Sequence, residues 1–185
     1  MILRELIENY VPRCEQEEAD RRVQLMCLDT FPNILSRENE LAHFTASSWI
    51  ADPRRERVLM VWHNIYRHWS WTGGHADGDP DLLAVALREA SEETGVTGLK
   101  VVSDGLYSLE NLNVLPHIKR GRYVPAHLHL NLTWLFEADD TLPLTVKPDE
   151  NSGVKWFPID EVIAAADEPE MTPVYTKLNE RLKAR

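Results

Sequence analysis

The chain has 185 residues, of which 43% are hydrophobic and 27% are charged, as is typical of one soluble globular domain with an additional helical segment. Its formal net charge of −10 argues against a protein that coats nucleic acids or binds anionic membranes, but not against a phosphorylated substrate. No apolar run is long enough to span a membrane, and the N-terminus does not resemble a signal peptide. Cys14 and Cys27 lack the spacing of zinc ligands, so we expect a cytoplasmic protein with free thiols.

The first residues of the chain are predicted to form a helical arm. Apolar residues recur at helical spacing over about the first ten positions, and a second helix is expected over 15–28. We therefore divide the chain into an N-terminal arm, 1–43, and a main domain, 44–185. The arm could mediate formation of a homodimer or cover a site.

The main domain alternates between predicted strands and helices. Strands are expected over 46–51, 57–63, 69–72, 99–109, 127–138 and 154–157. A central helix is expected before the fourth of these strands, and further helices are expected after 157. Strands on both sides of one central helix, followed by late helices, predict an α+β fold.

The most informative segment runs from Gly73 to Val96. A glycine pair opens a loop, and the loop leads into the central helix, which carries Glu89, Glu92 and Glu93 before a glycine. Spacings of three and four residues place these glutamates on one helix face, where like charges repel unless a cation is held against them. Carboxylate oxygens are the ligands that Mg²⁺ and Mn²⁺ prefer. A solvated acidic face is the alternative interpretation.

The start and the buried face of this helix are also predicted. Asp79 is expected to be the N-cap and Pro80 the first helical residue, because a capping carboxylate followed by proline is typical of helix starts. The side facing the core is expected to comprise Leu83, Leu87, Ala90 and Thr94.

The same segment resembles the Nudix box, whose pattern reads G-x5-E-x7-R-E-U-x-E-E-x-G-U, with U an aliphatic residue. When Gly74 is taken as the first glycine, the matching positions are Arg88, Glu89, Ala90, Glu92, Glu93, Gly95 and Val96. Pro80 stands where the pattern has its first glutamate. The resemblance implies the Nudix fold, an α/β/α sandwich with a mixed sheet, here with an N-terminal helical extension.

The resemblance to the Nudix hydrolase family also implies an activity and a set of residues. The activity is Mg²⁺-dependent (or Mn²⁺-dependent) cleavage of a pyrophosphate bond in a nucleoside diphosphate linked to another moiety. The implied metal ligands are Glu92, Glu93, Glu89 and the carbonyl of Gly74, with Glu89 as an alternative base. Arg88 would orient the glutamates by ion pairing, and Gly95 would end the helix with a positive φ.

Further candidates lie outside the box. Glu150 precedes a late strand, where Nudix hydrolases often place another carboxylate, so it is a candidate base or ligand; an exposed turn acid is the alternative. His127 and His129 point to the same face of a strand and could join His75 in an additional metal or phosphate-contact group. The alternative is that these histidines have a structural role, packed in the fold or hydrogen-bonded. Arg122, in a long loop, is a candidate phosphate contact.

Two other functions stay open. Pro80 motivates a nucleotide-binding or regulatory module that keeps the fold but has lost hydrolysis. Isoprenoid diphosphate isomerisation also occurs on this fold, but it generally needs an active-site cysteine, and Cys14 and Cys27 are far from the box in sequence. In each case we expect a small diphosphate as the ligand, and neither a nucleic acid nor a membrane as a partner.

Overall fold

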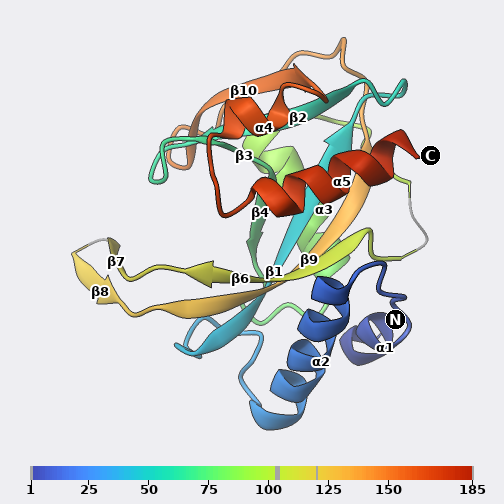
Figure 1. The fold of residues 1–185 in the computed structure, drawn as a ribbon. Coiled ribbons are helices and arrows are strands. Elements are labelled where there is room, and N and C mark those ends of the chain that lie inside the picture. The colour runs from blue at the N-terminus through green and yellow to red at the C-terminus, as the bar shows by residue number, and fades with distance from the viewer. Residues whose placement is uncertain (1, 103–104, 120, 185) are drawn as a thin grey trace.

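The computed structural model describes residues 2–102, 105–119 and 121–184, which are arranged around one mixed sheet (Figure 1). The helices in these ranges are α1 (Leu3–Glu8), α2 (Glu15–Thr30), α3 (Leu82–Thr94), α4 (Val162–Ala166) and α5 (Thr172–Lys183). The strands are β1 (Ala42–Ala51), β2 (Arg57–His63), β3 (Trp69–Ser70), β4 (Thr72–His75), β5 (Lys100–Val101), β6 (Ser108–Val114), β7 (His117–Lys119), β8 (Arg122–Val124), β9 (His127–Glu137) and β10 (Asn151–Pro158).

The two longest strands, β1 and β9, form the centre of the sheet and run parallel to each other. All other strand pairs are antiparallel: the order is β10-β2-β1-β9-β5, with β3 on β2, β4 on β1 and β6 on β9. The parallel pairing extends from Ala42 to Ala51 of β1, so the predicted strand over 46–51 was too short. The predicted strand over 99–109 is wrong, because β5 and β6 are separate strands that pair with different parts of β9.

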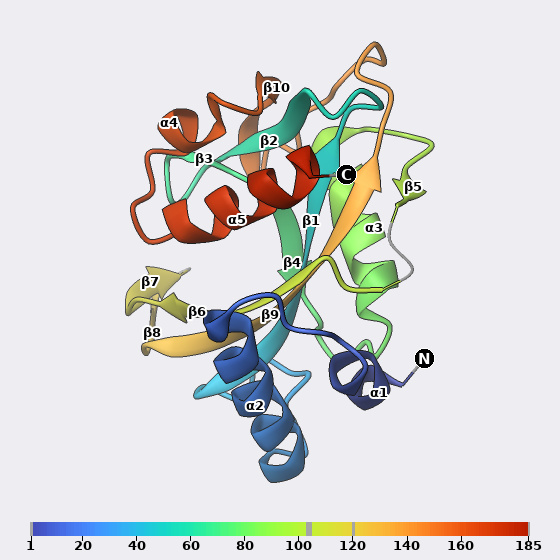
Figure 2. The same ribbon diagram turned by 45° about the vertical axis from the view of Figure 1, so that its right-hand side comes forward.

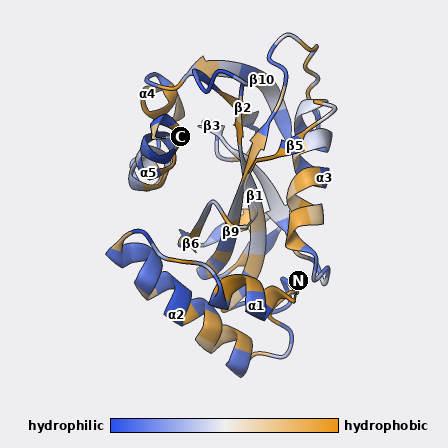
Figure 3. Cartoon of the chain, turned by 90° about the vertical axis from the view of Figure 1, so that its right-hand side faces the viewer, coloured by the Kyte–Doolittle hydropathy of each residue, from blue (hydrophilic) through white to orange (hydrophobic). Residues whose placement is uncertain are grey.

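Two hydrophobic cores cover the two faces of the sheet. Successive residues of a strand point to opposite faces. On β1, Phe44 and Ala46 belong to a core shared with α1, α2 and α3, whereas Trp49 and Ala51 belong to a core shared with α4 and α5. Figures 2 and 3 show α3 and α5 on opposite sides of the strands. The predicted α/β/α sandwich with a mixed sheet is therefore confirmed.

Both helices predicted for the N-terminal arm are present, and they pack on the sheet. Leu3 and Ile7 of α1 are buried in the same core as Cys27 of α2. The amide of Gln24 in α2 donates to the carbonyl oxygens of Glu110 at 3.3 Å and Asn131 at 3.4 Å. The division of the chain after residue 43 stays a proposal, and that position lies inside β1. Over the described residues, no helix is both long and apolar enough to cross a membrane.

Candidate functional site

The helix α3 starts later than the sequence pattern predicted. Its N-cap is Asp81, whose side chain accepts a hydrogen bond from the N–H of Ala84 at 3.1 Å. The prediction of Asp79 as N-cap is wrong, because Asp79 accepts instead from the N–H of Asp81 at 3.0 Å. Asp79 also lies 3.6 Å from the guanidinium of Arg88, so it supports the turn that leads into the helix. Pro80 lies in that turn and is exposed.

The other end of α3 was predicted correctly. Gly95 has a φ of 71°, the left-handed conformation that glycine adopts most easily, and its N–H donates to the carbonyl of Ser91 at 2.8 Å. A Cβ at Gly95 would lie 2.0 Å from Oγ1 of Thr145, so the loop that contains Thr145 packs directly on this cap.

The buried face of α3 was predicted only in part. Ala90 and Thr94 are buried as expected, whereas Leu83 and Leu87 are half-buried. The remaining fully buried positions are Leu82, Val85, Ala86 and Glu93. One glutamate of the cluster thus belongs to the buried face and points at β4.

The glycine pair of β4 lies against two glutamates of α3. The N–H of Gly73 donates to Oε2 of Glu93 at 3.2 Å, and the Glu93 residue is only 5% exposed. A Cβ at Gly74 would lie 2.7 Å from Cδ of Glu89, so a glycine is needed there for the Glu89 side chain to pack against the strand. The same contacts place the backbone of Gly74 beside the carboxylate of Glu89.

The third glutamate reaches the loop before β10. Nζ of Lys147 lies 2.8 Å from a carboxylate oxygen of Glu92 and 3.1 Å from one of Glu150. The loop is held against the helix by the amide of Asn151, which donates to the carbonyl of Glu93 at 2.8 Å. The structure therefore brings Glu150 into the glutamate cluster. Lys147 was not predicted, because nothing in the sequence places a loop lysine over the end of α3.

The electrostatics of this cluster favour a bound cation. Burial, together with the charges of Glu89 and Glu150, raises the pKa of Glu93 to about 8 against the opposing hydrogen bond from Gly73. Burial also raises the pKa of Glu89. Lys147 lowers the pKa of Glu92, whose side chain is exposed. Crowded carboxylate oxygens are a donor set that suits Mg²⁺ or Mn²⁺, so the residues fit the predicted metal.

Arg88, predicted to orient the glutamates by ion pairing, lies near Glu89. Its Nε lies 4.0 Å from Oε1 of Glu89, at the limit of an ion pair, and its side chain is 45% exposed. A further carboxylate in the loop before α3, Asp77, is paired with Arg37. Asp77 and Asp79, two carboxylates just before Pro80 in the chain, thus both contact arginines.

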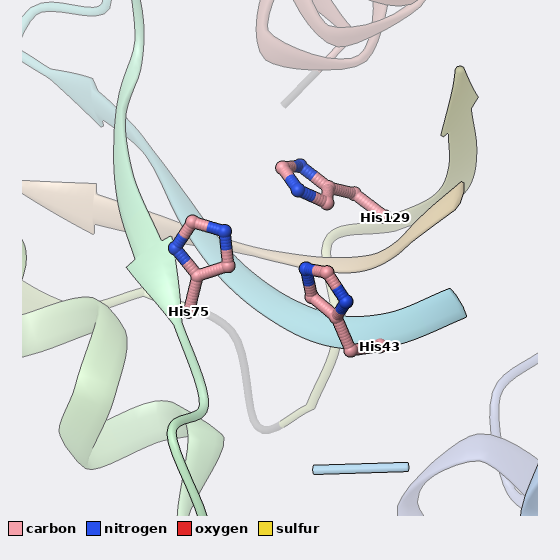
Figure 4. A group of neighbouring side chains, drawn as sticks. All are labelled: His43, His75 and His129. Carbon is pink, nitrogen blue, oxygen red and sulfur yellow. The ribbon is translucent and has the colours of Figure 1, made fainter. Parts of the chain in front are cut away.

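A second cluster consists of histidines. His43 from β1, His75 from β4 and His129 from β9 each offer a ring nitrogen within 4.8 Å of the others (Figure 4). His127 joins them, with its Nε2 3.2 Å from Nε2 of His129. His75, His127 and His129 were predicted to form a group, and the structure brings them together. His43 was missed, because only the strand pairing that sets His43 opposite His129 reveals it.

The histidines line a cavity of about 180 Å³. The other described residues around it are Arg37, Glu40, Tyr66, Val114, His117, Tyr123, Val124 and Pro125. Arg122, the candidate phosphate contact, begins β8 next to the lining residue Tyr123 and is exposed. Cys27 is buried in the core around α1 and α3 and Cys14 is exposed before α2, so neither belongs to the described lining.

The two clusters lie on opposite faces of β4. Gly74 faces Glu89 and α3, and the next residue along the strand, His75, must point the other way. His75 is paired with Thr45 of β1, which shares its face of the sheet with His43. In Figure 4 the imidazole of His75 accordingly extends from the strand toward His43 and His129.

Comparisons with a family model and with a curated protein point to the same family. The sequence model of the NUDIX domain matches residues 41–178. The Nudix hydrolase YfcD of Shigella flexneri, itself uncharacterised, is 31% identical over 98 residues, which are 52% of this chain and 45% of that protein. The chain thus spans less than half the length of this curated relative.

Solved structures share the fold at low sequence identity. A C. elegans Ap4A hydrolase in a binary complex matches with a TM-score of 0.57 and 22% identity, covering 77% of this chain and 98% of that chain. A NUDIX family hydrolase from Clostridium perfringens matches with a TM-score of 0.54 and 19% identity, covering 77% of this chain and 97% of that chain.

Proposed function

Since the chain belongs to the NUDIX domain family, we propose that it is a divalent-cation-dependent hydrolase of phosphoanhydride bonds. Its substrate would be a nucleoside diphosphate linked to another moiety. The observation that carries the proposal is a cluster of four carboxylates. Two of them, Glu89 and Glu93, contact the glycine pair of β4, and the other two, Glu92 and Glu150, contact Lys147.

The residues that would hold Mg²⁺ or Mn²⁺ are Glu89, Glu92, Glu93 and the carbonyl of Gly74. When bound, the ion would neutralise phosphate charge and lower the pKa of water. Of these ligands, Glu93 has the most fixed position, because it is buried and accepts from the N–H of Gly73. A ligand held in this way needs little reorganisation when substrate binds.

Glu150 is our candidate for the base that takes a proton from the attacking water. It lies on a loop rather than on the helix, and Lys147 connects it to Glu92. We also propose that His75, His127, His129 and Arg122 act on the substrate side, since the histidines line a cavity next to β8.

The test is a substrate panel with the full chain, in Mg²⁺ and in Mn²⁺. The panel contains nucleotide sugars, ADP-ribose, nucleoside triphosphates and dinucleoside polyphosphates, including Ap4A, the compound named for the C. elegans neighbour. Products are separated by chromatography, and ¹⁸O-labelled water shows which phosphorus is attacked. Label in a nucleotide product supports the proposal.

Pro80 favours one competing function, a module that binds a nucleotide without hydrolysing it. Asp77 and Asp79, the carboxylates just before it in the chain, are paired with arginines. Tight binding of a panel compound without product in either metal would establish this module and reject the hydrolase.

A further inference from the structure

We propose that His43, His75 and His129 form a second metal site, which binds a transition-metal dication such as Zn²⁺. Their three nitrogens lie within 4.8 Å of one another. Around a tetrahedral zinc with bonds of about 2.0–2.1 Å, ligand nitrogens are about 3.4 Å apart, so the rings need to close by no more than about 1.4 Å. Rotations of the side chains can supply a movement of this size.

The protonation state of His43 prepares it to bind a metal. Its Nδ1 lies 3.0 Å from the carbonyl oxygen of Asn39, which can only accept, so Nδ1 carries the hydrogen and Nε2 carries the lone pair. His43 is 3% exposed, and its buried Nε2 has no hydrogen-bond partner among the described residues. A metal-bound histidine commonly donates its other N–H to a backbone carbonyl in this way.

A second backbone carbonyl orients His127, the neighbour of His129. Nδ1 of His127 lies 2.9 Å from the carbonyl oxygen of Pro125 and must carry the hydrogen. Its Nε2 then carries a lone pair and lies 3.2 Å from Nε2 of His129. A backbone carbonyl thus orients one histidine on each of the two central strands.

The two sites differ in the metals that they select. Imidazole nitrogens suit zinc, copper, nickel and iron, whereas carboxylate oxygens suit magnesium and manganese. The histidine site lies on the other face of β4 from Glu89, as the direction of Gly74 shows. Three protein ligands leave an open coordination position, which is typical of reactive rather than structural zinc. That position would face the cavity of about 180 Å³ and take water or an anionic oxygen.

The experiment measures zinc in the full chain. The protein is stripped with a chelator, equilibrated with Zn²⁺ in millimolar Mg²⁺ and desalted, and zinc is then counted by atomic emission. We expect about one zinc per chain in the wild type. His43→Gln, His75→Gln and His129→Gln should each weaken zinc binding by at least about 100-fold, since loss of a ligand exceeds the roughly 10–100-fold cost of losing an outer partner.

Two sets of controls separate this site from other sources of zinc. His117→Gln changes a histidine that lines the same cavity but is not in the group of three, and it should retain zinc. Glu92→Gln and Glu93→Gln change the carboxylate site and should also retain zinc. Zinc content that depends on the glutamates, or that survives all three histidine substitutions, would overturn the inference.

A spectroscopic measurement on the wild type guards against variants that fail to fold. X-ray absorption of the zinc-loaded protein should show nitrogen and oxygen neighbours at about 2.0–2.1 Å with an imidazole signature and no sulfur. Sulfur neighbours, or oxygen neighbours alone, would contradict the site. Because zinc is counted without any substrate, a failed hydrolase test and a failed zinc test remain distinguishable.

Discussion

The two faces of β4 present two different kinds of metal-binding group. On the α3 face, Glu89 and Glu93 pack against the glycine pair, and their carboxylates crowd one another. On the other face, His75 meets rings from β1 and β9, and the β1 ring of His43 is buried beside the carbonyl oxygen of Asn39. The first group accumulates negative charge and gains most from a hard dication. The second group carries no such charge and can stay assembled without an ion.

The two sites are also held together by different contacts. The carboxylates need outside support, which they receive from the N–H of Gly73, from Lys147 and from a loop packed on Gly95. The histidines receive theirs from the register of the central strands, where His43 is opposite His129. Substitutions on the α3 face should therefore change hydrolysis and leave zinc binding intact.

The largest effect is expected from Glu93→Gln. It removes one ligand charge but keeps the volume and an oxygen that can accept from Gly73, so the fold should be retained. A metal-ion contribution of several kcal/mol corresponds to a loss of turnover of about 10³-fold. Steady-state rates with the best panel substrate measure this loss, and zinc content should not change. Glu180→Gln on the exposed side of α5 is the matched control. Undiminished turnover in Glu93→Gln would remove Glu93 from the active site.

The sequence predicted the three glutamates of α3 but missed one histidine of the other face, His43, for a physical reason. Glu89, Glu92 and Glu93 are neighbours on one helix, so local spacing alone puts them together. The helix end at Gly95 was also predicted, because a C-cap with a positive φ depends only on the local residue type. His43 is far from His75 and His129 in sequence, and only the pairing of β1 with β4 and β9 unites them.

The incorrect predictions have the same origin. Asp79 looked like an N-cap, but Asp81 reaches the free N–H of Ala84 and takes that role. Local spacing could not choose between two nearby carboxylates that compete for one helix start. Likewise, Lys147 enters the cluster through the docking of its loop on the end of α3, which depends on tertiary contacts with Thr94 and Glu93.

The next largest effect concerns the stability of the α3 face. Gly95→Ala combines a left-handed residue with a Cβ placed 2.0 Å from Thr145, and we expect a total loss of about 3 kcal/mol in the free energy of unfolding. Gly98 has the same φ of 71° but nothing within 4 Å of its Cβ position, so Gly98→Ala should show the backbone cost alone, about 1 kcal/mol. Urea unfolding of both variants gives the difference. Equal losses of unfolding free energy in the two variants would mean that the contact with Thr145 adds no cost at Gly95.

A smaller effect is expected from Gly74→Ala. The added methyl group would collide with Cγ and Cδ of Glu89, which can rotate away, so the fold should survive while the carboxylate is displaced. We expect turnover to fall about tenfold, which is about 1.4 kcal/mol of lost transition-state stabilisation. Gly105→Ala is the control, because its Cβ would meet no atom of the described residues within 4 Å. Zinc content should be retained, since His75 points to the opposite face; its loss would show that the two sites are coupled through β4.

The smallest effect is expected from Lys147→Met. Nζ of Lys147 lies between the carboxylates of Glu92 and Glu150, where it offsets the charge that a divalent cation would also offset. Removing a partly exposed ion pair changes free energies by about 0.2–1 kcal/mol, so the Mg²⁺ concentration for half-maximal turnover should fall about two- to threefold. Lys155→Met removes an equal charge beside the ring of Phe157 and should leave the Mg²⁺ requirement unchanged. A higher Mg²⁺ requirement in Lys147→Met would mean that the lysine positions the carboxylates for the cation rather than competing with it. In that event the α3 face would resemble the histidine face, as a site assembled before its metal arrives.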